Sequence, residues 1–186
     1  RLMSGGTAVA FAIGLPLFGT ILIILNDRYP NIREGITITT SVCLALVVFG
    51  LVPEVTSGGR PGFVLAEIVP GLPIAFKVEP LGMLFAMVAS GLWVVTSIYA
   101  VGYMRSHHEV QQTRFYACFA IAISSAMGIC FAGNMLTLFI FYEVLTISTY
   151  PLVTHSETKD AVKAGRTYLG ILIGTSIAFL LLAIIW

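Results

Sequence analysis

The chain of 186 residues is 58% hydrophobic and only 10% charged, with a formal net charge of +1. An average soluble domain is about 45–50% apolar and about 25% charged. Charges this scarce cannot cover a soluble globule, which excludes a soluble cytoplasmic enzyme. The near-neutral balance also excludes nucleic-acid binding, because that needs a dense Lys and Arg surface. The composition therefore predicts an integral membrane protein whose first partner is the lipid bilayer.

The apolar runs have the length of transmembrane helices. A hydrocarbon core about 30 Å thick needs about 20 apolar residues per helix, whereas strands of a membrane β-barrel alternate in windows of about ten residues. We therefore predict an all-α membrane protein, a polytopic bundle of six transmembrane helices that forms a single domain over residues 1–186. The predicted spans cover residues 6–26, 35–55, 80–104, 113–132, 134–154 and 162–186.

Residues 56–79, between the second and third spans, form the longest predicted connection. Two short apolar runs, FVLAEIV and LPIAFKVE, lie on either side of Pro70 and Gly71. Pro followed by Gly is typical of a tight turn, and short apolar runs around a turn favour paired strands. We predict a short external β-hairpin here, on the membrane surface.

Positive charges divide unevenly between the two sides of the predicted bundle. One side carries Arg28, Arg33, Arg105, Arg114, Lys159, Lys163 and Arg166, and the other carries Arg1, Arg60 and Lys77. By the positive-inside rule, the loops 27–34, 105–112 and 155–161 are predicted to be cytoplasmic. The N-terminus and the 56–79 hairpin are then external, in a multi-pass protein of the cell inner or plasma membrane.

Neither the cysteines nor the histidines form a recognisable catalytic centre. The cysteines, at positions 43, 118 and 130, fall in three different predicted spans without metal-ligand spacing, and a buried Cys usually behaves as a small hydrophobe. The histidines, at positions 107, 108 and 155, fall in predicted loops. The sequence thus predicts no metal site and no cofactor, and it leaves open whether the chain works within an oxidoreductase complex.

Glu143 is the acidic residue placed deepest in a predicted span. It lies ten residues into the fifth span, about 13 Å along the helix axis. An ionised carboxylate near the bilayer centre costs about 2.5–3.5 kcal/mol, so Glu143 needs a cation, water or a proton. Burial disfavours its charge and a nearby cation restores it, which predicts a group that takes up and releases protons. The alternative is a structural ion pair that locks two helices.

A polar stripe follows Glu143 along its helix. Thr146, Tyr150 and Thr154 share its face and predict a hydrated path from the cytoplasmic end to the carboxylate. Alternatively, the Thr hydroxyls bond the carbonyls four residues back and Tyr150 lies at the membrane interface. Lys163 is the nearest basic candidate for a partner, and its alternative role is anchoring at the cytoplasmic surface.

Small residues at a spacing of four predict close helix contacts. Ser124 and Gly128 form such a pair in the fourth predicted span, and Gly170 and Gly174 form another in the sixth. We expect both pairs to pack against helices of this same chain.

The stretch FYACFAIAISSAMGICFAGNMLTLFIFYEVLTISTYPLVTH, followed by KDAVKAGRTYLGILIG, resembles the proton-translocating antiporter-like membrane subunits. Such subunits occur in respiratory complex I, in Mrp-type cation/proton antiporters and in membrane-bound hydrogenases. The segments KVEPLGMLF and VGYM support the resemblance, which covers residues 74–186. The segments STYPLVTH and AGRTYLGILIGTS are most similar to the Mrp D-type subunits.

The resemblance implies roles for two residues. The protonatable Glu of the family's fifth span matches Glu143, and a Lys near the start of its sixth span matches Lys163. The main partner of that Glu in the family is a Lys on the seventh span. Because this chain ends in the sixth predicted span, the resemblance implies the N-terminal portion of a longer subunit that works with other membrane subunits of a hetero-oligomeric complex.

The predicted function is proton conduction or cation/proton antiport within such a complex, with H⁺ and, in an antiporter, Na⁺ or K⁺ as the transported ions. A second possibility is a proton-pumping membrane-arm subunit of a redox-driven complex, of the complex I or hydrogenase type. A third is a scaffold or assembly subunit that transports nothing.

Overall fold

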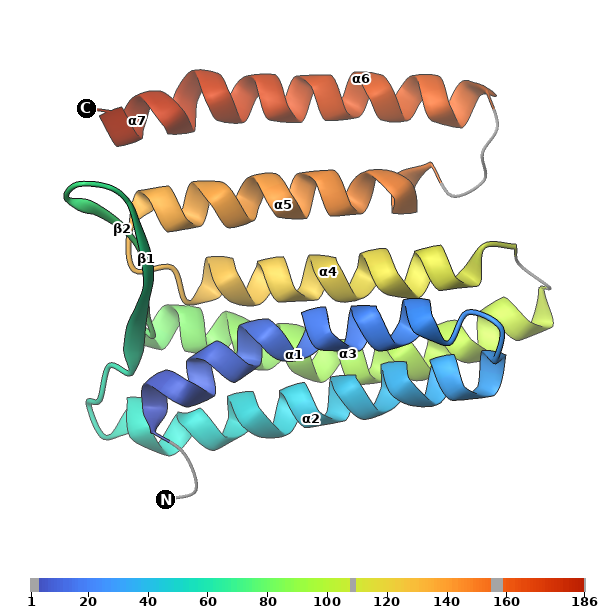
Figure 1. The fold of residues 1–186 in the computed structure, drawn as a ribbon, viewed down its shortest axis with the longest axis horizontal. Coiled ribbons are helices and arrows are strands. Elements are labelled where there is room, and N and C mark those ends of the chain that lie inside the picture. Colours follow the sequence, from blue (N-terminus) through green and yellow to red (C-terminus); the bar gives the residue numbers. More distant parts are fainter. Residues whose placement is uncertain (1–3, 108–109, 155–158, 186) are drawn as a thin grey trace.

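The computed structural model describes residues 4–107, 110–154 and 159–185. Within these ranges, six long helices are each long and apolar enough to cross a membrane, which confirms the predicted all-α fold (Figure 1). They are α1 (Gly5–Leu25), α2 (Pro30–Thr56), α3 (Pro80–Ser106), α4 (Gln112–Cys130), α5 (Met135–Val153) and α6 (Lys159–Ser176). A π-helical turn, η1 (Ile177–Leu181), and the short α7 (Leu182–Ile185) continue α6.

The main correction to the predicted boundaries lies at the start of the second span. Helix α2 begins at Pro30, not at residue 35, because the fixed backbone angle of Pro suits the first helical position. Arg33 and Glu34 therefore lie inside a helix and are buried, whereas the sequence placed them in the 27–34 loop. Most of the other ends agree within a few residues, while residues 155–158 of the predicted 155–161 loop, and Trp186, lie outside the described residues.

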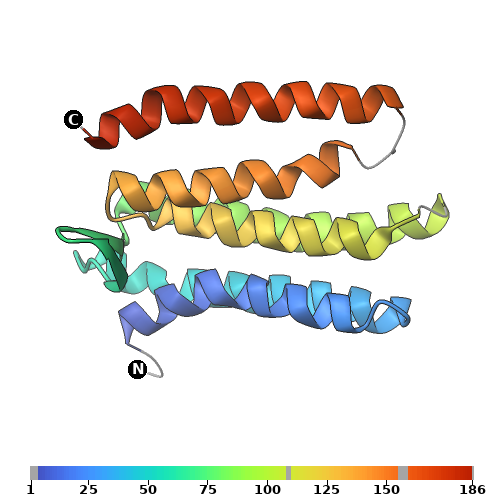
Figure 2. The same cartoon turned by 45° about the horizontal axis from the view of Figure 1, so that its top comes forward.

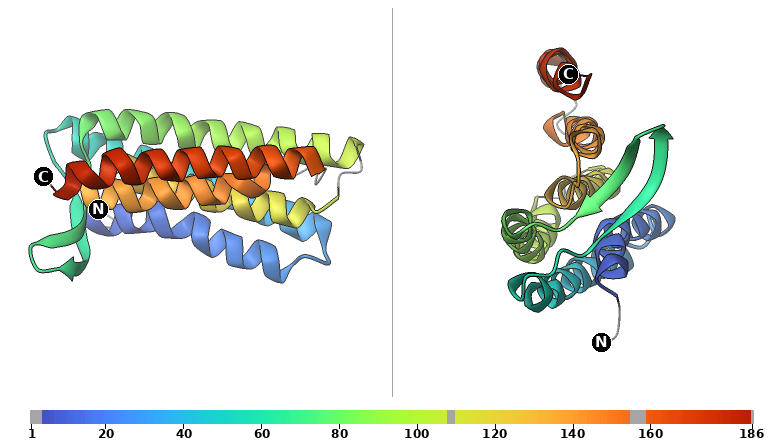
Figure 3. Two further views of the ribbon diagram at one scale, coloured as in Figure 1. Left: turned by 90° about the horizontal axis from the view of Figure 1, so that it is seen from above. Right: turned by 90° about the vertical axis from the view of Figure 1, so that its left-hand side faces the viewer.

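The helices stack outward from a four-helix core. Consecutive helices run antiparallel, α5 packs on α4, and α6 packs on the outer side of α5 (Figures 2 and 3). The buried share of the most apolar 18-residue stretch falls from 44% in α4 to 17% in α5 and 6% in α6. Large faces of α5 and α6 are thus left open to lipid or to further helices.

The predicted hairpin is confirmed, with strands β1 (Gly62–Val69) and β2 (Leu72–Lys77) paired antiparallel. Gly71 closes the turn with a φ of 86°, a left-handed conformation that Gly adopts without steric cost. The hairpin lies across the end of the bundle at which α1 begins and α7 ends (Figure 1). At its base, a hydrogen bond from Lys77 lowers the pKa of Glu79, the residue before α3.

The start of α5 holds the hairpin in place. Asn134 caps α5 by accepting a hydrogen bond from the Thr137 backbone N–H at 2.8 Å, and its Nδ2 donates to the Pro73 carbonyl at 2.6 Å. The Ala75 backbone N–H donates to the Thr137 hydroxyl at 3.0 Å. The hairpin and the helix that carries Glu143 therefore form one connected unit.

Of the two small-residue pairs, one packs within the chain and one does not. Ser124 donates to the Ile13 carbonyl of α1 at 2.7 Å, and a Cβ at Gly128 would overlap the Phe141 ring of α5. Added Cβ atoms at Gly170 and Gly174 would meet nothing within 4 Å among the described residues. The expected intramolecular contact of this second pair was therefore wrong, because α6 turns these glycines away from α5.

Candidate functional site

Glu143 lies in the middle of α5, eight residues after Met135 and ten before Val153. These separations correspond to about 12 Å and about 15 Å along the helix axis. Of the residues next along this side of α5, Val144 is 38% exposed and Ile147 is 56% exposed. Glu143 thus lies at the edge of the open face of α5, at mid-depth of the bundle.

The carboxylate of Glu143 has an unusual local environment. Its Oε1 atom is shielded from solvent and has no hydrogen-bond partner among the residues that the structure describes. The ion pairs recorded among the described residues involve side chains other than Glu143. A buried carboxyl oxygen that accepts no hydrogen bond costs free energy, because burial removes the water that would otherwise donate to it.

A cavity of about 430 Å³ opens between α5 and α6 beside this residue. Tyr142, which precedes Glu143, lines it together with Leu138 of the same helix. From the other side, α6 and η1 contribute Leu172, Thr175, Ser176, Phe179 and Leu180. The cavity therefore combines an apolar surface with three hydroxyl groups close to the depth of Glu143.

The polar stripe beyond Glu143 is packed and bonded within its own helix. Thr146 donates its hydroxyl to the Tyr142 carbonyl at 3.0 Å, and Thr154 donates to the Tyr150 carbonyl at 3.0 Å. Both Thr side chains are buried. A hydroxyl that has donated its proton can still accept a hydrogen bond, so this geometry leaves these oxygens able to accept from water.

The start of α6 packs against the far end of the stripe. Gly165 of α6 is buried, and a Cβ there would overlap Thr154 Cγ2 and lie 3.1 Å from Tyr150 Cε2. Lys163 is exposed, and among the described residues no ion pair joins it to Glu143. The structure therefore brings Tyr150 and Thr154 together with α6 but does not bring Lys163 to the carboxylate.

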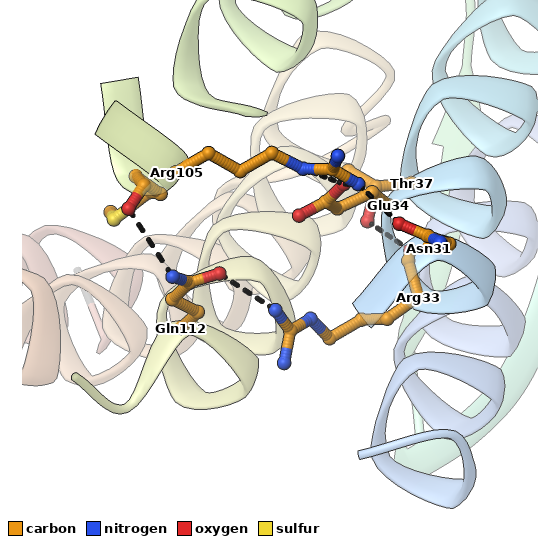
Figure 4. A network of polar contacts seen from close by, with 7 residues as sticks. Asn31, Arg33, Glu34, Thr37, Arg105 and Gln112 are labelled. Atoms are coloured by element: carbon orange, nitrogen blue, oxygen red, sulfur yellow. Dashed lines mark hydrogen bonds and ion pairs between the residues drawn. The ribbon is translucent and has the colours of Figure 1, made fainter. Parts of the chain in front are cut away.

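A second group of charged residues, whose contacts the sequence analysis missed, lies where α2, α3 and α4 meet (Figure 4). Arg105, near the end of α3, donates from Nε to Glu34 Oε2 at 2.9 Å and from Nη2 to Asn31 Oδ1 at 2.5 Å. Glu34 is only 3% exposed. This ion pair connects α2 to α3 at the end of the bundle opposite the hairpin.

Arg33 makes the matching connection from α2 to α4. Its Nη1 donates to Thr113 Oγ1 and its Nη2 to Gln112 Oε1, both at 2.7 Å. Gln112 in turn donates to the Met104 carbonyl of α3 at 3.3 Å. Pro30 was the signal that could have revealed this cluster, because a helix that starts there places Arg33 and Glu34 on its first turns.

The described residues contain no group of three or more His, Cys, Asp or Glu side chains placed to hold a metal ion. At mid-depth the described residues present the carboxyl group of Glu143 and the hydroxyl groups that line the cavity.

Residues 70–116 match the family described as NADH-ubiquinone oxidoreductase (complex I), chain 5 N-terminus. The chain is 26% identical over 166 residues to the A/B subunit of a probable K⁺/H⁺ antiporter of Rhizobium meliloti, covering 84% of this chain and 16% of that protein. It is 28% identical over 166 residues to the N subunit of the NADH-quinone oxidoreductase of Desulforudis audaxviator, covering 88% and 32%.

The fold also occurs in a solved complex. A chain of the membrane-bound sulfane sulfur reductase, an archaeal respiratory membrane complex, superposes with a TM-score of 0.78 at 20% identity, covering 94% of this chain and 35% of that one. The chain thus spans a third or less of the length of each of the two sequence relatives. Together the matches confirm the predicted resemblance to antiporter-like membrane subunits of cation/proton antiporters and respiratory complexes.

Proposed function

We propose that this chain translocates protons as an antiporter-like subunit of a multisubunit membrane complex, with Glu143 as the group that takes up and releases the proton. The observation that carries the proposal is the shielded Oε1 atom in the middle of α5, which has no hydrogen-bond partner within residues 4–107, 110–154 and 159–185. A permanently ionised carboxylate at the centre of a bilayer costs about 2.5–3.5 kcal/mol. Protonation removes that cost, and the approach of a cation restores the charge.

The cation that controls Glu143 is proposed to come from a further helix packed on the open face of α5 and α6. The side chains of Val144 and Ile147 are exposed on this face, close to Glu143 along the helix. Few residues of α6 are buried. The resemblance to subunits with a Lys on the next span supports this proposal. Movement of such a Lys toward Glu143 would release its proton, and movement away would draw one in.

Protons are proposed to reach Glu143 along the polar stripe from the cytoplasmic end. Thr146 and Tyr150 would contribute hydroxyl oxygens to a water-filled path, with Lys163 as the exposed cation at its entrance. The acceptor capacity that remains on the Thr146 hydroxyl supports this role. In this proposal the loops around residues 27–34, 105–112 and 155–161 face the cytoplasm of a cell whose plasma membrane holds the complex.

Proton flux into membrane vesicles tests the proposal. We expect Glu143→Gln, which keeps the size of the side chain but cannot ionise, to reduce flux to background in the assembled complex. Asp160→Asn is the matched control, because it removes an exposed carboxylate at the start of α6. Asp160→Asn should leave flux unchanged. Native flux in an assembled Glu143→Gln variant would overturn the proposal, whereas loss of assembly in this variant alone would favour the scaffold role.

A second candidate is a proton-pumping subunit of a redox-driven complex. The similarity to the N subunit of an NADH-quinone oxidoreductase favours it, as does the match of residues 70–116 to a complex I family. The subunits that co-purify with the chain distinguish the two. Quinone-, NADH- or hydrogenase-type modules would identify a redox-driven complex, and cation-antiporter subunits without such modules would identify an antiporter, with Na⁺ or K⁺ as the exchanged ion.

A further inference from the structure

Among the residues that the structure describes, no carboxylate pairs with the buried guanidinium of Arg33. Arg33 is 5% exposed, and its two recorded hydrogen bonds go to neutral oxygens, those of Thr113 and Gln112. Its Nε is buried without an acceptor among the described residues. A guanidinium carries five N–H donors, so most of its hydrogen-bonding capacity remains unused.

The neighbouring carboxylate does not neutralise Arg33. Glu34 is paired with Arg105, which donates to it from Nε at 2.9 Å. Tyr116 lies beside the Arg33 guanidinium, 5.5 Å from ring centroid to Cζ, and contributes only the face of its ring. A buried charge without a counter-charge is costly, so an anion beside Arg33 would be stabilised.

A pocket of about 410 Å³ gives an anion access to this charge. Arg33 lines it together with Pro30, Gln111 and Thr113. Helix α2 begins at Pro30 and helix α4 at Gln112, so two helix N-termini, each with a partial positive charge, meet at its wall. Figure 4 shows the side chains of Arg33 and Gln112 extending toward each other between α2 and α4.

Two acidic residues also line the pocket. Glu34 is already paired with Arg105, and Asp27 is exposed. An exposed carboxylate is screened by water and salt, whereas Arg33 is shielded from both. Arg33 is therefore the buried cation of the pocket that no described carboxylate pairs with.

The depth of the pocket in the bilayer indicates which anion can reach it. Arg33 lies three residues into α2, about 5 Å along its axis, which is the depth of the headgroup region of a bilayer. Phospholipid phosphates occupy this depth in both leaflets, and basic pockets between membrane helices bind such groups. A planar guanidinium edge matches two phosphate oxygens.

We propose that this pocket, at the junction of α2, α3 and α4, binds a phosphate group through Arg33 and the N-termini of α2 and α4. The phosphate comes from the headgroup of a membrane phospholipid or from free inorganic phosphate. Its binding ties the three helices together at the end of the bundle opposite the hairpin.

Binding of lipid and of phosphate to the purified protein tests the proposal. The protein is kept in complex with the subunits that co-purify with it. The protein is stripped of lipid in detergent, and binding of phosphatidylglycerol and of inorganic phosphate is titrated separately, by native mass spectrometry and by equilibrium dialysis. We expect Arg33→Gln to weaken binding about tenfold or more, since it removes a charge-assisted contact. Arg28→Gln is the matched control, because it removes an exposed positive charge at the same end of the bundle.

The two titrations separate the sources. Binding of phosphatidylglycerol that depends on Arg33 identifies the lipid headgroup, and Arg33-dependent binding of inorganic phosphate alone identifies the free ion. If Arg33→Gln fails to fold, Arg33→Lys takes its place in the test. Arg33→Lys keeps the charge but loses the planar guanidinium, so it should bind phosphate with intermediate affinity. Absence of binding to the wild-type protein, or equal weakening by Arg28→Gln and Arg33→Gln, would overturn the proposal and leave water as the occupant.

Discussion

Glu34 and Glu143 are both acidic residues within membrane helices, and their surroundings differ. Glu34 accepts a hydrogen bond from Arg105 Nε at 2.9 Å, so its carboxylate contacts a cation directly. Glu143 has a shielded Oε1 without a donor among the described residues. The first contact joins α2 to α3, and the second residue is the one that we propose as the proton carrier.

Arg105→Gln should lower the melting temperature of the bundle, because it leaves the carboxylate of Glu34 buried without its cation. The loss should be smaller than for a fully buried pair, since the Arg105 side chain is 54% exposed. Thermal unfolding in detergent measures it. The double variant Glu34→Gln/Arg105→Gln should lose less than the sum of the two single variants, and strict additivity would show that the pair is not coupled.

For single residues, the sequence correctly placed Glu143 in the middle of a span, and it missed the burial of Arg33 and Glu34. Glu143 was found because a single carboxylate in the middle of an apolar span is conspicuous without coordinates. Arg33 and Glu34 were missed because the predicted helix began five residues too late, which turned two buried charges into loop charges. The hydrogen bonds of Thr146 and Thr154 needed coordinates, because a Thr hydroxyl can bond its own helix or water equally well.

Close helix packing depends on positions at which no side chain fits. Gly82 near the start of α3 is such a position, since a Cβ there would overlap the Cys130 carbonyl oxygen at the end of α4. Cys130 lies just before the loop that pairs with β2, where the Lys77 backbone N–H donates to the Phe131 carbonyl at 2.8 Å. The contact therefore joins α3, α4 and the base of the hairpin.

Gly82→Ala should lower stability by about 1–3 kcal/mol, because backbone atoms cannot move aside for the added methyl group. Gly91→Ala on the same helix is the control, since a Cβ there meets nothing within 4 Å. It should be neutral or stabilising, because Ala favours a helix over Gly. Thermal unfolding of the two variants checks both expectations, and equal effects would show that the contact at Gly82 does not limit packing.

Element types were largely predictable and element contacts were not. Apolar length alone indicated the six spans, and Pro70 with Gly71 indicated the hairpin. The attachment of the hairpin to Asn134 and Thr137 could not be predicted, because the two segments are joined only by tertiary packing. For the same reason, spacing alone could not show that Gly128 packs on α5 while Gly170 and Gly174 face away.

The two ends of the helical bundle carry different structural features. The hairpin lies at one end, and the network of Arg33, Glu34 and Arg105 lies at the other (Figures 1 and 4). From the positive-inside rule we propose that the second end faces the cytoplasm. The chain covers 16% and 32% of the length of two relatives, and we propose that further helices pack on the open faces of α5 and α6.

Single cysteines in a background without the three native ones test this orientation. Ser57→Cys, at the hairpin end, should react with a membrane-impermeant maleimide added outside intact cells. Ser106→Cys, at the opposite end, should react only after the cells are opened. Both side chains are exposed, so accessibility does not favour either. The reverse pattern would invert the topology and with it the direction assigned to the proton path.

The most direct test of the account is the protonation state of Glu143 during transport. Infrared difference spectroscopy of the complex detects the C=O stretch of a neutral carboxyl group, which an ionised carboxylate lacks. We predict that such a band changes in intensity when a proton gradient is applied or transport is driven, and that Glu143→Gln abolishes this change while Asp160→Asn keeps it. A band change that survives in Glu143→Gln, or no change in the wild-type complex during transport, would contradict the assignment of Glu143 as the proton carrier.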